Sequence, residues 1–147
     1  METFPKNTPA LVVERATAIL PATTQAAYFT VTGRVIVTQI VGEVTVVFDG
    51  TANSIKLISN PTVGADVDLC AAAVVTSDAV GTVYTITGTL ANAIIPTTSG
   101  AVQAQPNGIL VTAGTIDLDA TATDATGSTK WTIHYIALDA GSKIVIA

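Results

Sequence analysis

The chain has 147 residues, of which 49% are hydrophobic and only 12% are charged, and its formal net charge is −5. This length suits one domain with a single core, whereas soluble domains usually carry about 25% charged residues. The six cations are scattered and form no basic stripe, which argues against a nucleic-acid or anionic-membrane partner.

The first 25 residues differ from the rest of the sequence. Pro5, Pro9 and Pro21 interrupt a threonine-rich stretch around one apolar run, residues 10–19. Prolines discourage a helix, so we predict an extended N-terminal arm (1–25) that precedes a single β domain (26–147). The arm is too apolar to be left in water, and we expect it to add a strand to an exposed sheet edge of a neighbouring subunit or capsid protein. The expected contact residues are Leu11, Val12, Val13 and Ile19.

From about residue 28 onward, apolar and polar side chains alternate with period two, as is typical of half-buried strands. β-branched residues supply most of these positions, and Gly, Pro and Asn separate the runs. The pattern predicts an all-β protein, namely an antiparallel sandwich, jelly roll or barrel of about 8–10 short strands. The expected strands are 27–32, 34–41, 43–49, 53–59, 66–76, 82–90, 108–112, 115–123, 130–138 and 142–147.

The sequence also contains turn-forming residues and one segment that could be either a strand or a helix. Gly33 and Gly42 bracket one expected strand, and residues 91–107 are the least patterned segment, so we expect a long loop there. Asn107-Gly108 favours a tight type I′ hairpin turn. The alanines at 71–73 leave a short helix open as an alternative to the strand at 66–76, although the period of two favours the strand.

One face of the strand at 130–138 and one face of the strand at 115–123 are expected to form the structural core. The predicted core residues are Ile116, Leu118, Trp131, Ile133 and Tyr135. His134 lies on the opposite face with Lys130 and Thr132, which predicts a solvated or interface side chain and not a general base.

No motif in the sequence indicates catalysis, a cofactor or a metal, and we expect no enzyme. His134 is the only histidine, and Cys70 is the only cysteine, with apolar neighbours that predict a small buried side chain. No phosphate loop or nucleophile motif is present.

Two pairs of carboxylates share a strand face at a spacing of two residues. Asp117 and Asp119 form one pair, with Asp124 in the following turn, and Asp66 and Asp68 form the other. Clustered carboxylates can bind calcium, but the spacing lacks the pattern of a dedicated loop. We therefore expect these side chains to face solvent.

Surface composition and the N-terminal sequence indicate where the protein folds and whether it assembles. Threonine, at roughly one residue in six, takes much of the place of charged residues, and such a weakly polar exterior favours contact with other subunits. Residues 1–6 lack the apolar region of a secretory signal, and no apolar run reaches the ~18 residues of a membrane span. A single cysteine among so many strands suggests folding in a reducing cytoplasm.

Residues 105–147 carry a family resemblance. A strand at 108–111 leads into the run from Gly114, and a strand with Trp131 and Tyr135 is followed by a Leu138-Asp139-Ala140-Gly141 turn and a short final strand. This order resembles the small β-rich virion structural proteins of tailed bacteriophages, most closely the capsid decoration, or cement, proteins. The resemblance implies no catalytic residue and no cofactor. It implies a homo-oligomer, often a trimer, that binds the major capsid protein on the outer surface of the assembled capsid after synthesis in the host cytoplasm.

Two other functions stay open at this point. A phage tail, baseplate or head-fibre protein would bind a host surface receptor or glycan. A glycan-active enzyme on a jelly roll would need two close carboxylates and exposed aromatic rings in one cleft.

Overall fold

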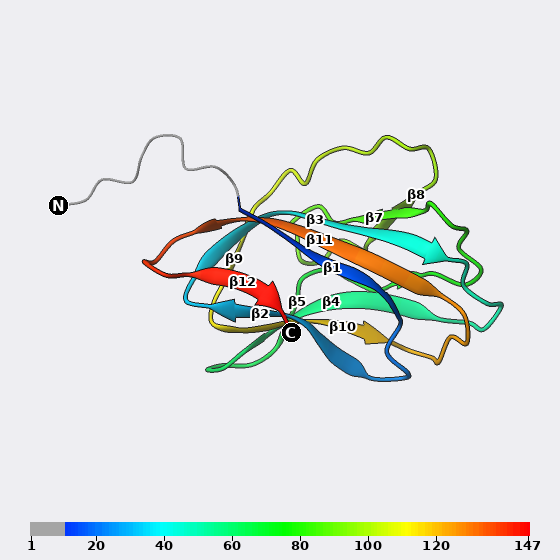
Figure 1. Ribbon diagram of the computed structural model, residues 1–147, viewed down its shortest axis with the longest axis horizontal. Helices are drawn as coiled ribbons and strands as arrows, with labels where there is room; N and C mark the ends of the chain where they lie inside the picture. Colours follow the sequence, from blue (N-terminus) through cyan, green and yellow to red (C-terminus); the bar gives the residue numbers. More distant parts are fainter. Residues whose placement is uncertain (1–10) are drawn as a thin grey trace.

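The computed structural model describes residues 11–147, and this part of the chain is an all-β sandwich of two antiparallel sheets (Figure 1). The strands are β1 (Leu11–Ile19), β2 (Gln25–Thr32), β3 (Val35–Val46), β4 (Ser54–Pro61), β5 (Val67–Asp68), β6 (Ala73–Val74), β7 (Val83–Thr85), β8 (Ile95–Thr97), β9 (Ile109–Val111), β10 (Gly114–Ala120), β11 (Ser128–Ala137) and β12 (Lys143–Ile146). The predicted fold class is confirmed in its sandwich form.

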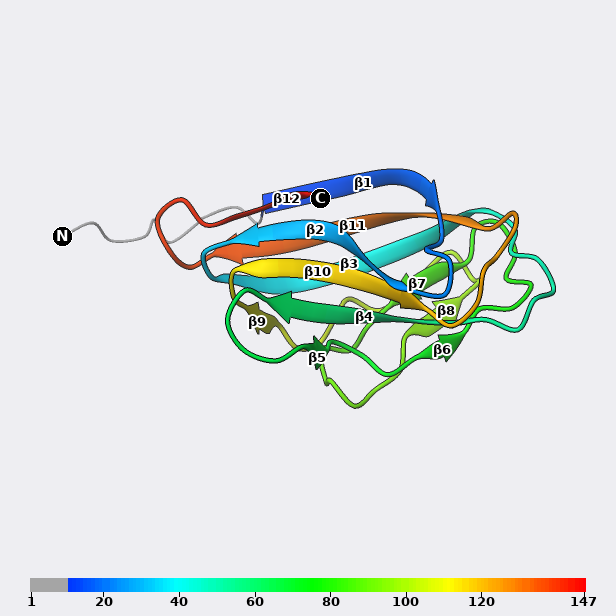
Figure 2. The same ribbon diagram turned by 90° about the horizontal axis from the view of Figure 1, so that it is seen from below.

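Each sheet has six strands. Sheet A has the order β1-β11-β3-β7-β8, and β9 pairs with β3 beyond the end of β7. Sheet B has the order β12-β2-β10-β4-β5, and β6 also pairs with β4. Figure 2 shows β2, β10 and β4 side by side, with β1 and β12 close together where the two sheets approach each other.

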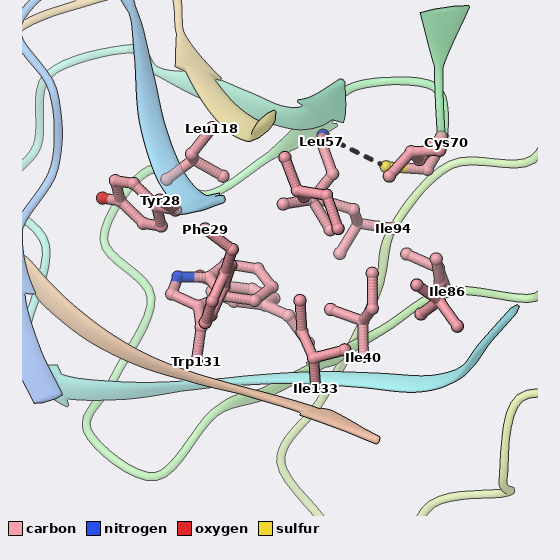
Figure 3. Packing of buried hydrophobic residues seen from close by; sticks show 14 of the residues in the cluster. Tyr28, Phe29, Ile40, Leu57, Cys70, Ile86, Ile94, Leu118, Trp131 and Ile133 are labelled. Carbon is pink, nitrogen blue, oxygen red and sulfur yellow. Dashed lines mark hydrogen bonds between the residues drawn. The ribbon is translucent and has the colours of Figure 1, made fainter. Parts of the chain in front are cut away.

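The core fills the space between the sheets, and the five predicted core residues are all buried. Trp131 is the largest of them, and its indole stacks on Tyr84 with ring centroids 6.2 Å apart, while its Nε1 donates to Thr129 Oγ1 at 2.9 Å. Figure 3 shows Trp131 packed with Phe29, Ile133 and the surrounding aliphatic side chains. Alternation along β10 and β11 therefore predicted the inward faces correctly.

Gly42 does not separate two strands, contrary to the prediction. It lies inside the single long strand β3, opposite Trp131 on one side and Tyr84 on the other. A Cβ at this position would lie 2.7 Å from the Trp131 ring. The glycine makes room for the indole instead of ending a strand.

The middle of the chain differs most from the expected strand list. The segment predicted as a strand at 66–76 contains only the two-residue strands β5 and β6, with Leu69 and Cys70 buried between them. The expected loop at 91–107 contains β8, which pairs with β7. The predicted hairpin at Asn107-Gly108 is wrong, because β9 pairs with β3 and not with the strand before it.

Gln105 closes a gap along β3 between its two partners β7 and β9. Its Oε1 accepts from the Ile40 amide at 3.2 Å, and its Nε2 donates to the Asn107 carbonyl at 2.6 Å and the Val37 carbonyl at 3.4 Å. A buried side-chain amide thus replaces part of a missing strand, because unpaired backbone groups are costly.

The predicted arm is also corrected where the structure describes it. Residues 11–19 form β1, the edge strand of sheet A, which pairs antiparallel with β11 of the same chain. The boundary at residue 25 therefore does not separate an arm from the domain. Residues 1–10 lie outside the described residues.

Candidate interaction surface

The outward face of sheet A carries a row of apolar side chains at one end. Ile136 on β11 pairs with Ile36 on β3, and Ile36 pairs with Leu110 on β9. Residues that pair directly across antiparallel strands share a face. The chain neighbours that are buried in the core are Val35, Val37, Ile109, Val111 and Tyr135. Leu110 is 55% exposed, and Ile36 is half-buried. The three side chains form a continuous uncharged strip, here called the apolar row.

The apolar row continues around the edge of the sandwich into a shallow groove. This groove has a volume of about 180 Å³, and its lining includes Ile109, Leu110, Pro61, Val67 and Leu90. Both Val67 and Leu90 are exposed large hydrophobic residues. The row and the groove together offer apolar surface that spans parts of both sheets.

The charges of sheet A lie towards the opposite end of its outward face. Thr132 of β11 pairs with Glu14 of β1, and Lys130, the next residue of β11 on the same face, pairs with Glu43 of β3. The Lys130 Nζ and Glu43 Oε2 atoms lie 3.3 Å apart. Such exposed ion pairs contribute little stability. The outward face is therefore divided into a charged end and an uncharged end.

One ion pair borders the apolar end of the sheet. Arg34 and Asp139 join the loops that flank β3 and β11, with Nη2 and Oδ1 2.6 Å apart. Hydrogen bonds from Arg34 lower the pKa of Asp139, and the same interaction raises the pKa of Arg34. Both groups stay charged at neutral pH and mark a polar rim.

The four residues expected to contact a partner all lie on β1 but point in different directions. Val13 packs against the core from a partly buried position. Leu11, Val12 and Ile19 are exposed, and Val12 is beside His134 on the outward face. Leu11 and Val12 lie at the end of β1 near the row, Ile19 pairs with Ser128 at the opposite end of β11, and Val13 belongs to the fold.

The free backbone edge of β1 is poorly suited to further strand addition. The register with β11 shifts between Arg15 and Ala18, so the strand is bulged at its middle. Arg15 pairs with Trp131 on the inward side, and its guanidinium lies 4.3 Å from the centroid of the Tyr28 ring. Bulges and inward-pointing charges protect sheet edges from pairing with other chains. The exposed side chains of β1 are therefore better placed for contact than its hydrogen-bonding edge.

The residues considered for a catalytic role, His134 and Cys70, do not lie together. His134 lies half-buried on the outward face between Val12 and Gln39, as expected, and Cys70 is buried. Cys70 Sγ accepts a hydrogen bond from the Leu57 amide at 3.4 Å, and burial raises the pKa of its thiol to about 11 (Figure 3). The thiol is therefore protonated and weakly reactive at neutral pH.

The carboxylates correct the prediction of solvent-facing side chains. Asp117 is only 3% exposed, and Asp124 is buried in a turn where it accepts from the backbone amides of Asp49 and Thr126. Asp66 and Asp68 are exposed, as expected, and Asp119 is half-buried. Alternation placed Asp117 on the correct face of β10 but did not reveal what covers it.

Within residues 11–147, no three His, Cys, Asp or Glu side chains gather as a metal-binding group, and no helix is long and apolar enough to cross a membrane. Comparisons with protein-family models, with curated proteins and with solved structures found no match to this chain. The fold defines the class of the protein as an antiparallel β-sandwich.

Proposed function

We propose that this chain is a non-enzymatic virion structural protein that decorates and stabilises the capsid of a tailed phage. It binds copies of itself, with a trimer favoured, and the major capsid protein on the outer capsid surface. The observation that carries the proposal is the uncharged apolar row of sheet A, continued by the groove beside Leu110, on a chain with few charges. Contiguous exposed apolar surface of this kind marks protein contacts.

The energetics suit attachment through several weak contacts. Fully burying a Leu or Ile side chain contributes about 1.5–3 kcal/mol, so covering the exposed half of Leu110 contributes on the order of 1 kcal/mol. A stable interface buries about 800 Å² per partner, which is more than three side chains supply. The groove and the exposed residues Leu11 and Val12 extend the same surface, and the scarcity of charge keeps the desolvation cost low.

The proposed role of the N-terminal segment follows from the place of β1. Leu11, the first described residue, pairs with Tyr135, which comes directly before Ile136 of the apolar row in β11. Residues 1–10 include the apolar side chain Phe4. We therefore propose that residues 1–10 take part in attachment together with Leu11 and Val12, whereas Ile19, at the opposite end of β1, belongs to a different part of the surface.

The first experiment measures assembly and capsid binding of the full chain. Light scattering at micromolar concentration is expected to give a closed oligomer, and the protein is expected to coat purified capsids that lack it. Leu110→Lys should reduce coating at least tenfold, because a charge in the row must be desolvated. Val63→Lys is the matched control, since Val63 is 89% exposed on a loop and outside the row. A monomer that does not coat capsids would contradict the proposal, and so would equal coating by both variants.

The second experiment tests the N-terminal segment. Deleting residues 1–9 leaves β1 intact and should weaken coating moderately, with the far-ultraviolet circular dichroism of the sandwich unchanged. A deletion through residue 20 would also remove an edge strand of sheet A, so it is unsuitable as a test of attachment. Unchanged coating after the shorter deletion would exclude residues 1–9 from the contact.

One observation favours the alternative, a tail, baseplate or head-fibre protein that binds a host glycan. A pocket of about 290 Å³ lies between the β7–β8 pair and residues 101–106, and the polar residues Thr85, Thr87, Thr97 and Gln103 are part of its lining. No aromatic residue is among its lining side chains, and sugar sites commonly use such rings. Binding to a glycan array that Gln103→Ala abolishes, together with no coating of capsids, would favour this alternative.

A further inference from the structure

A second polar site lies on the outward face of sheet B, around Asp117. This residue pairs with Ala27 on β2 and with Ile58 on β4, at a shift in register of β10. Its Oδ2 accepts from Gln25 Nε2 at 2.7 Å and from Asn60 Nδ2 at 3.2 Å. Its Oδ1 is buried and has no hydrogen-bond partner. A buried carboxylate oxygen without a partner is costly and calls for a compensating group.

A second carboxylate shares the same amide. Gln25 Nε2 also donates to Asp66 Oδ2 at 3.3 Å, and Asp66 belongs to the segment that links β4 to β5. The side-chain NH₂ group of Gln25 therefore lies between an oxygen of Asp117 and an oxygen of Asp66. Two negatively charged groups therefore converge on one small region beside the Gln25 amide, where a cation would interact with both.

The two charges are not neutralised by a cationic side chain in the part of the chain that the structure describes. The ion pairs there join Arg34 to Asp139, Lys56 to Asp68 and Lys130 to Glu43. None of them includes Asp117 or Asp66. The amides of Gln25 and Asn60 supply hydrogen bonds but no net charge.

We propose that Asp117, Asp66, Asn60 and Gln25 bind a hard divalent cation, with Ca²⁺ preferred. Turning each side-chain amide about its last torsion presents an oxygen in place of the nitrogen, and the two ends of an amide have nearly the same shape. Two carboxylates and two amide oxygens then face the cation, and water completes the six to eight ligands that Ca²⁺ takes. Mg²⁺ demands a stricter octahedral geometry, which ligands from two strands and a surface segment are less able to supply.

Binding would fasten the segment at 62–66 to the outer face of sheet B. That segment connects β4 to the short strand β5, which has only two residue pairs with β4. The inference does not depend on the proposed function, because it rests on the hydrogen bonds around Asp117 and concerns a different class of ligand.

The test titrates Ca²⁺ and Mg²⁺ into the full chain after treatment with a chelator. Calorimetry and the Tm are followed together. We expect heat release and a rise in Tm that half-saturate on the order of 10⁻⁴–10⁻³ M Ca²⁺, the range of modest sites, with a weaker response to Mg²⁺. Asp66→Asn and Asp117→Asn should each weaken Ca²⁺ binding at least tenfold. Asp66 is exposed, so its variant keeps the test valid even if the buried Asp117 variant unfolds.

Gln25→Glu makes the test sharper because it predicts a gain. The substitution removes the bridging donor and adds a carboxylate, so it should lower the Tm in chelator and increase Ca²⁺ affinity about tenfold. Glu43→Gln is the control, since it removes one charge from the outward face of the other sheet and should leave binding unchanged. No response of the wild-type chain at concentrations tenfold above that range would overturn the proposal. Binding that is equal in the Asp66, Asp117 and Glu43 variants would overturn it as well.

Discussion

Gly42→Ala is expected to destabilise the sandwich through a direct clash with Trp131. The added Cβ would lie 2.7 Å from Cη2 and Cζ3 of the indole, about 1 Å inside the ~3.5–4.0 Å of a normal carbon contact. The ring has little freedom to withdraw, because it is 1% exposed, stacks on Tyr84 and donates to Thr129. Overpacking of this kind costs about 1–3 kcal/mol, which exceeds the ~0.5–1 kcal/mol that alanine gains over glycine within a strand.

Urea unfolding followed by circular dichroism measures this free energy without relying on tryptophan fluorescence. Gly50→Ala is the matched control, since no heavy atom lies within 4 Å of its added Cβ, and its unfolding free energy should be unchanged or slightly higher. In a Trp131→Leu background the clash disappears, so Gly42→Ala should become nearly neutral, with a coupling energy of about 1 kcal/mol or more. An equal cost in both backgrounds would show that Gly42 is needed for some reason other than the indole.

Three further predictions concern the core and the strand gap. Trp131→Ala should lower the unfolding free energy by about 3–5 kcal/mol through cavity formation, and a loss under about 1 kcal/mol in the same urea titration would contradict the packing described above. Gln105→Glu keeps an acceptor for the Ile40 amide but cannot donate to two backbone carbonyls, so it should cost about 1–3 kcal/mol and speed hydrogen exchange of that amide; unchanged exchange would exclude the bridging role. Cys70 has a pKa raised from 9.0 to about 11, so the folded chain holds the thiol proton more tightly than the unfolded chain, and stability should fall as pH rises from about 9 to about 11. Cys70→Ala should remove that part of the alkaline loss, and a thiol reagent at pH about 8 should label the native protein no faster than it unfolds.

The candidate surface could be predicted from the sequence only in general terms. Few charges and many threonines indicated contact with other subunits, but Ile36, Leu110 and Ile136 lie far apart in the chain and carry no local signal. They become neighbours because β11, β3 and β9 pair in one register. The register of a strand depends on its pairing partners, which no local sequence pattern identifies. The apolar row could therefore be located only from the structure.

The sequence by itself determined the all-β class and the inward faces of the central strands. A strand places successive side chains on opposite sides, so the alternation around Ile116 and Trp131 was sufficient to locate the core. Tertiary structure decided the rest. It placed β1 on the edge of its own sheet, put Gly42 under an indole, and covered Asp117 with side chains from β2 and β4. The physical reason is that alternation depends on nearest neighbours along the chain, whereas pairing and cover depend on segments brought together only when the two sheets close over one core.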